Sequence, residues 1–62
     1  MKAWIARDKN GALWMYETAP LYNENFEEFY CGFGELNSEL DPRFFQEITF
    51  ENSPMEVELK LV

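Results

Sequence analysis

The fold of this chain is decided near its start, by the stretch KAWIARDKNGALWMYET at residues 2–18. Residues 2–8 and 12–18 are rich in β-forming side chains, and Asp8-Lys9-Asn10-Gly11 between them suits a tight turn closed by a left-handed glycine. The pattern predicts an antiparallel hairpin. Its register pairs Arg7 with Leu13, Ile5 with Met15, and Trp4 with Tyr16.

Both faces of this hairpin are largely apolar. Side chains alternate along a strand, so one face carries Trp4, Ala6, Trp14 and Tyr16, and the other carries Ile5, Leu13 and Met15 with Arg7. Either the rest of the chain wraps the hairpin, or one face meets another molecule. Because Trp and Tyr are enriched at binding hot spots, the candidate protein-binding residues are Trp4, Trp14 and Tyr16.

The middle of the chain gives a mixed signal. Pro20 ends the second strand, and residues 21–25 read as a loop. Residues 29–34 favour a third strand, in which Gly32 and Gly34 mark a bulge or a close backbone approach. A short helical turn over residues 24–29 is the alternative.

The last third predicts a short helical turn followed by a hairpin. Ser38 is a candidate helix cap, and Pro42 restricts the helical turn to a segment ending near Gln46. Residues 47–50 and 55–61 then read as strands joined by a turn at 52–54. The second strand alternates cleanly, with Met55, Val57, Leu59 and Leu61 facing a core. The predicted fold class is therefore α+β and mostly antiparallel β, in a single domain spanning residues 1–62.

The core of a 62-residue chain is small. The single cysteine, Cys31, excludes an internal disulfide, and there is no histidine to bind a metal. Two other sources of stability remain for the chain: burial of its eleven aromatic residues, and association into a homodimer. Since no stretch reads as a signal peptide or membrane span, we expect a cytoplasmic protein.

Charge is distributed unevenly around a net value of −7. Residues 23–58 contain ten acidic residues and one basic residue, Arg43. Such a surface repels nucleic acids and anionic membranes, so neither is an expected partner. It serves either solubility or mimicry of nucleic-acid phosphates on a basic protein. The candidate acidic-surface residues are Glu24, Glu27, Glu28, Glu56 and Glu58.

The sequence predicts no enzyme. Cys31 has no histidine to activate it, and the paired carboxylates lack the room for a cleft that acid–base catalysis needs. We therefore predict no catalytic residue, no metal site and no cofactor.

Two segments carry a resemblance. Residues 4–16 (Trp4-Ile5-Ala6-Arg7-Asp8, then Gly11, Leu13 and Tyr16) and residues 48–57 (Ile48-Thr49-Phe50-Glu51-Asn52-Ser53-Pro54, then Glu56-Val57) resemble the two ends of small uncharacterised proteins of phages, prophages and mobile elements of gut bacteria. The resemblance implies a setting and no catalytic residue. The expected function is a small acidic interaction protein that binds a protein partner through an aromatic sheet face. The alternative is a phage-type inhibitor of a host or defence protein that acts as an acidic nucleic-acid mimic.

Overall fold

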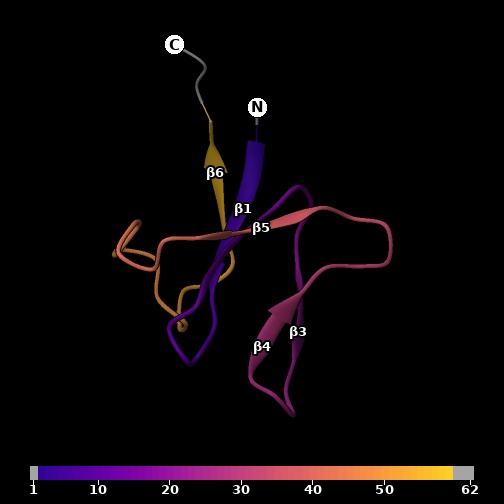
Figure 1. Cartoon of the computed structure of the whole chain (residues 1–62), viewed down its shortest axis with the longest axis horizontal. Coiled ribbons are helices and arrows are strands. Elements are labelled where there is room, and N and C mark those ends of the chain that lie inside the picture. Colours follow the sequence, from indigo (N-terminus) through magenta and orange to yellow (C-terminus); the bar gives the residue numbers. More distant parts are fainter. Residues whose placement is uncertain (1, 60–62) are drawn as a thin grey trace.

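A computed structural model describes residues 2–59 of the chain as six strands in two antiparallel sheets (Figure 1). The main sheet has the order β5-β2-β1-β6 and is built from β1 (Lys2–Arg7), β2 (Leu13–Tyr16), β5 (Asn37–Leu40) and β6 (Met55–Glu58). The second sheet pairs β3 (Leu21–Asn23) with β4 (Glu28–Tyr30). We call this hairpin, residues 21–30, the arm, and it stands to one side of β1 and β6 in Figure 1.

The structure confirms the N-terminal hairpin and its register. Arg7 lies opposite Leu13, Ile5 opposite Met15, and Trp4 opposite Tyr16. The Asp8 amide donates to the Ala12 carbonyl at 2.8 Å, and the Gly11 amide donates to the Asp8 carbonyl at 2.9 Å. Gly11 has φ = 97°, a conformation that other residues adopt only with strain, so this position needs glycine.

The core lies on one face of the main sheet, which we call the core face. Ile5 and Leu13 on this face are fully buried, and Ile48 packs against them from the irregular segment at residues 41–54. Met15, Leu40 and Val57 surround this centre. The segment therefore serves as the second layer of a molecule that has no helix to cover its sheet over residues 2–59.

Arg7 holds this irregular segment in place. Its guanidinium donates five hydrogen bonds, all to backbone carbonyls, at 2.7–3.2 Å. The acceptors are Gly11, Pro42, Phe44, Phe45 and Ile48. A guanidinium has five N–H donors in a fixed planar arrangement, so all of them are used here.

The arm covers part of the opposite face. The Phe29 amide donates to the buried Asp8 carboxylate at 2.8 Å, and the Phe29 carbonyl accepts from the Tyr16 hydroxyl at 3.2 Å. The Phe29 ring lies 5.1 Å from Tyr22 and 6.2 Å from Phe50, centroid to centroid. Both faces of the first hairpin are thus covered in part by the chain itself.

The α+β prediction is wrong, because residues 2–59 contain no helix and the fold is all-β. The helical turn expected from Ser38 to Gln46 begins instead as β5, which pairs along β2 from Leu40 opposite Leu13 to Asn37 opposite Tyr16. A cap at Ser38 stabilises at most one turn of helix, whereas pairing of β5 with β2 gives hydrogen-bond partners to the backbone groups along the outer edge of β2. Residues 42–47 form turns rather than a helix.

The predicted C-terminal hairpin is also wrong. Residues 47–50 form no strand, and β6 pairs antiparallel with β1, with Lys2 opposite Glu58 and Ile5 opposite Met55. The Ile48 carbonyl accepts from the Arg7 guanidinium instead of from a neighbouring strand. Thr49 and Asn52 close a turn, because the side chain of each accepts from the backbone amide of the other. Val57 packs against the core as expected, whereas Met55 is exposed, contrary to the prediction. Leu61 lies outside the described residues.

The middle of the chain forms a different strand from the one that the sequence predicted. The strand expected over 29–34 is shorter and earlier, as β4, and it pairs with β3 at residues that we had expected in a loop. The alternative helical turn over 24–29 is wrong, since residues 24–27 form the turn of the arm. The Asn23 carboxamide accepts the amides of Asn25 and Phe26 there, which starts a turn and not a helix.

Candidate protein-binding surfaces

Trp4 and Trp14 lie on the face of the main sheet opposite the core, which we call the tryptophan face. Trp4 is opposite Tyr16, and Trp14 is opposite Ala6, so the two indoles are diagonal neighbours on adjacent strands. Diagonal positions are about 7–8 Å apart, within reach of aromatic side chains. Both indoles are half-buried and therefore present part of their rings at the surface.

The indole N–H groups of these tryptophans are unused. Among residues 2–59 neither nitrogen donates a hydrogen bond, and every buried side-chain polar atom in that range has a partner. Both N–H groups therefore reach the surface, where a binding partner can accept from them. Tryptophan N–H groups usually find such a partner once they are fully buried.

Tyr16, the third predicted aromatic, is not at the surface. Only 2% of it is exposed, since the arm covers it. Burial, the nearby Asp8 carboxylate and then Cys31 and Glu28 raise the pKa of Tyr16 to about 12. Tyr16 is therefore buried within the fold and is not displayed on the tryptophan face.

A carboxylate flanks each tryptophan on its outer side. Glu56 of β6 is opposite Trp4, and Glu39 of β5 is opposite Trp14. Both are exposed. Lys2 lies 3.9 Å from Glu56, a contact between exposed groups that contributes little. Glu39 was not among the acidic residues singled out in the sequence, because only the pairing of β5 with β2 places it here.

The five predicted acidic residues fall into two separate places. Glu56 and Glu58 lie on β6, whereas Glu24, Glu27 and Glu28 lie at the turn of the arm. Glu27 is already engaged, since its carboxylate lies 3.0 Å from the Lys9 ammonium. This ion pair raises the pKa of Lys9. The structure thus does not bring these carboxylates together as one continuous row.

Several exposed apolar residues were missed by the sequence analysis. On the outer side of the arm, Leu21 is 53% exposed and its cross-strand partner Tyr30 is 45% exposed. Phe33 is fully exposed, and Leu36 is exposed close by. The signal that could have found Phe33 is its position between Gly32 and Gly34, because a turn there directs an isolated aromatic ring outward.

The loop that carries Phe33 is well braced. The Glu35 amide donates to the Gly32 carbonyl at 3.1 Å. The Glu35 carboxylate accepts from the Thr18 hydroxyl at 2.6 Å and from the Gly32 amide at 3.2 Å. A Cβ at Gly32 would lie 3.3 Å from this carboxylate, so glycine allows the close approach. Phe33 is therefore displayed by a defined turn.

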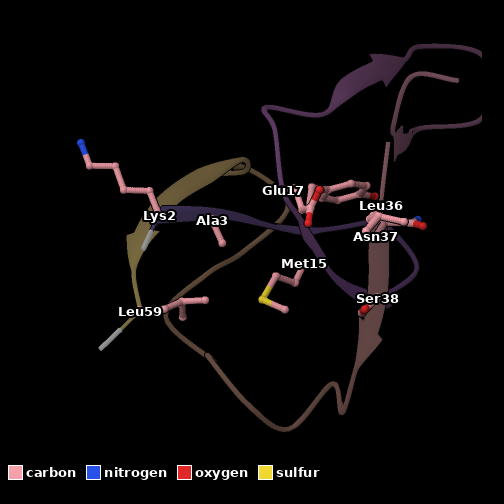
Figure 2. Close-up of a pocket in the computed structure, with 9 residues that line it drawn as sticks. Lys2, Ala3, Met15, Glu17, Leu36, Asn37, Ser38 and Leu59 are labelled. Carbon is pink, nitrogen blue, oxygen red and sulfur yellow. The ribbon is translucent and has the colours of Figure 1, made fainter. Parts of the chain in front are cut away.

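A cavity of about 320 Å³ opens beside this loop, on the core side of the main sheet (Figure 2). Ala3, Met15 and Leu59 converge on it in Figure 2, and Leu36 and Ser38 border it from the β5 side. Leu36 and Ser38 are exposed, so the cavity is open to solvent. Its size is at the lower limit for a ligand site, which is roughly 300 Å³.

Residues 2–59 contain no cluster of three or more side chains that could hold a metal ion. No helix within that range is long and apolar enough to cross a membrane. Comparisons of the chain with protein-family models, with curated proteins and with solved structures found no match. The functional argument therefore rests on the surfaces of the chain alone.

Proposed function

We propose that this chain is a non-enzymatic cytoplasmic interaction protein, which binds a protein partner through the tryptophan face. One observation carries the proposal. Trp4 and Trp14 are diagonal neighbours on adjacent strands with unused N–H donors, and an exposed carboxylate lies on the outer side of each.

This arrangement suits a partner with basic side chains. The face of an indole ring attracts an arginine or lysine cation, and the attraction strengthens when the pair is removed from water. Glu39 and Glu56 are placed to pair with the same cations, and the net charge of −7 draws a basic partner from a distance. The partner surface that fits is therefore a basic segment of another protein.

The competing function is mimicry of nucleic acid by the acidic surface as a whole. Such a mimic would act in the phage or mobile-element setting that the resemblance of residues 4–16 and 48–57 implies. It is favoured by the exposure of Glu24, Glu28, Glu56 and Glu58 on two separate elements. Binding through the tryptophan face depends on the carboxylates of Glu39 and Glu56, whereas mimicry depends on the acidic surface as a whole.

A binding titration with matched charge variants separates the two. The probe is a short peptide of alternating Arg and Gly, and the readout is tryptophan fluorescence. Glu39→Gln with Glu56→Gln removes two charges beside the tryptophans, and Glu24→Gln with Glu28→Gln removes two charges from the arm. The first pair should weaken binding roughly tenfold and the second pair far less, because close charge pairs dominate such contacts.

Trp14→Leu is the second variant, since it keeps an apolar side chain but removes the indole. It should also weaken the peptide roughly tenfold, in line with the loss of an aromatic hot spot. Equal weakening by both Glu pairs would favour the acidic mimic instead. No binding of the peptide to the unaltered protein, even in low salt, would exclude the tryptophan face as a site for basic partners.

A further inference from the structure

We infer that two copies of this chain associate by placing the Phe33 ring of each copy into the cavity beside Leu36 of the other. This association is separate from the proposed function, because it uses neither the tryptophans nor the carboxylates beside them, although Lys2 and Tyr16 also line the cavity. Ala3, Met15 and Ser38 around the cavity belong to the core side of the sheet, and Trp4 and Trp14 belong to the opposite side.

The projecting part of the contact is Phe33. Burying a phenylalanine removes roughly 150–250 Å² from water, so an aromatic ring left fully exposed on a braced turn is costly in a monomer. The Glu35 carboxylate fixes the turn through Thr18 and Gly32. The backbone that carries the ring is therefore already in place, so burying the ring costs mainly the rotamer freedom of the side chain itself.

The receiving part is the cavity of about 320 Å³, whose inner wall is apolar through Ala3, Met15 and Leu59 (Figure 2). A site of this size suits one inserted side chain better than a drug-sized ligand. The exposed Leu36 forms part of its border, on the side where the chain leads back to Phe33.

A second copy is the occupant because the chain carries both complementary parts close together. Phe33 and Leu36 are three residues apart, so at most about 11 Å of chain separates the ring's backbone from the border of the cavity. A two-fold axis between two such loops makes both insertions at once, which gives a closed dimer in place of an open chain of copies.

Charge gives this dimer a distinctive response to salt. Each copy carries a net charge of −7, so two copies repel each other in low salt. Screening removes that repulsion, and the dimer should strengthen as salt rises. Binding of a basic peptide to the tryptophan face should weaken under the same change.

The experiment is sedimentation equilibrium over a concentration series reaching roughly 1 mM, in low and in moderate salt, since a contact of this size is expected to be weak. The unaltered chain should form a dimer that tightens with salt. Phe33→Ala should raise the dissociation constant roughly tenfold or more. Phe26→Ala is the matched control, because Phe26 is also exposed, at 72%, on the turn of the arm, and it should have no effect.

A complementation test shows whether the ring enters the cavity. Ser38→Trp places a large side chain over the cavity and should also prevent dimer formation. Each variant retains the part that the other lacks, so an equal mixture of Phe33→Ala and Ser38→Trp should reach a higher average mass than either alone. Near-ultraviolet circular dichroism and urea midpoints confirm that both variants are folded.

Three results would overturn the inference. They are a monomer at every concentration and salt, a Phe33→Ala variant that associates like the unaltered chain, and a mixture no heavier than its two components. None of them bears on the peptide titration of the tryptophan face, so the two proposals fail independently.

Discussion

Arg7 connects three parts of the chain through one side chain. Its five donors reach the first turn at Gly11 and the irregular segment between Pro42 and Ile48. Hydrogen bonds from a charged donor contribute about 1.5–3 kcal/mol each when measured singly, though not additively. The guanidinium thus supplies hydrogen bonds to backbone carbonyls of residues 41–54, which a neighbouring strand would supply in a regular sheet.

Replacing Arg7 by lysine should lower the free energy of unfolding by about 1–3 kcal/mol. Lysine keeps the charge, but it cannot supply five donors in a planar arrangement. Arg43→Lys is the matched control, because Arg43 pairs with Asp41 at 2.6 Å at an exposed site and should cost less than about 1 kcal/mol. Urea unfolding measures both, and equal losses would contradict the role given to Arg7.

Tyr16 should make stability fall at high pH. Burial raises its pKa to about 12 in the folded chain from the ordinary value of 10.0, so the folded state holds the proton more tightly than the unfolded state. The resulting stability is complete below pH 10 and is lost as pH rises from about 10 to about 12, with a loss of roughly 1–3 kcal/mol. Tyr16→Phe lacks this loss, so the difference in unfolding free energy between the two proteins should shrink across that window.

At the scale of the elements, the arm depends on few contacts with the main sheet. Its polar attachments are at Phe29, to Asp8 and to Tyr16, and at the exposed ion pair of Glu27 with Lys9. Its rings Tyr22 and Phe29 pack near Phe50. A hairpin of two strands is only marginally stable alone. We therefore expect the arm to open as a unit before the main sheet does.

Asp8→Ala should release the arm selectively. Hydrogen exchange at the Phe29 amide should quicken roughly tenfold, because this amide loses its charged acceptor. Asn10→Ala is the control in the same turn, since it removes a 2.9 Å bond to the Ala12 amide and no side-chain hydrogen bond to Phe29. If Asn10→Ala accelerates exchange at Phe29 equally, the attachment runs through the whole turn and not through the carboxylate.

The elements that could be predicted are those set by neighbours in sequence. The first hairpin follows from alternation and from Gly11, and its register is confirmed. The pairing of β2 with β5 and of β1 with β6 depends on edges that only the folded chain provides. The pairing of β3 with β4 is local, and it was missed because residues 21–25 read as a loop. Residues 38–46 show the difficulty, since Ser38 resembles a helix cap locally while the free edge of β2 selects a strand.

The same reasoning applies to the candidate surfaces. Alternation correctly placed Trp4, Trp14 and Tyr16 on one face, but it could not show that the arm would bury Tyr16. For Phe33 the error is the opposite one. A short apolar segment is expected to be buried, and only the fold shows that none of residues 2–59 covers this ring.

For the whole molecule, changing the salt concentration distinguishes binding at the tryptophan face from association of two copies. Basic partners of the tryptophan face and copies of this chain respond to screening in opposite directions, because one contact joins unlike charges and the other joins like charges. An excess of basic peptide should leave the dimer intact in moderate salt. Loss of the dimer on peptide binding would show that the two surfaces overlap.

The position of β1 between β2 and β6 has a consequence for the order of events during synthesis. β1 is made first of the described strands and can pair with β2 almost at once, but its other neighbour, residues 55–58, is made last. Until then the backbone of β1 on that side has no partner, and an unpaired strand edge readily accepts a foreign strand. A ribosome stalled before residue 55 would therefore hold a nascent chain prone to aggregation, although the finished protein covers that edge.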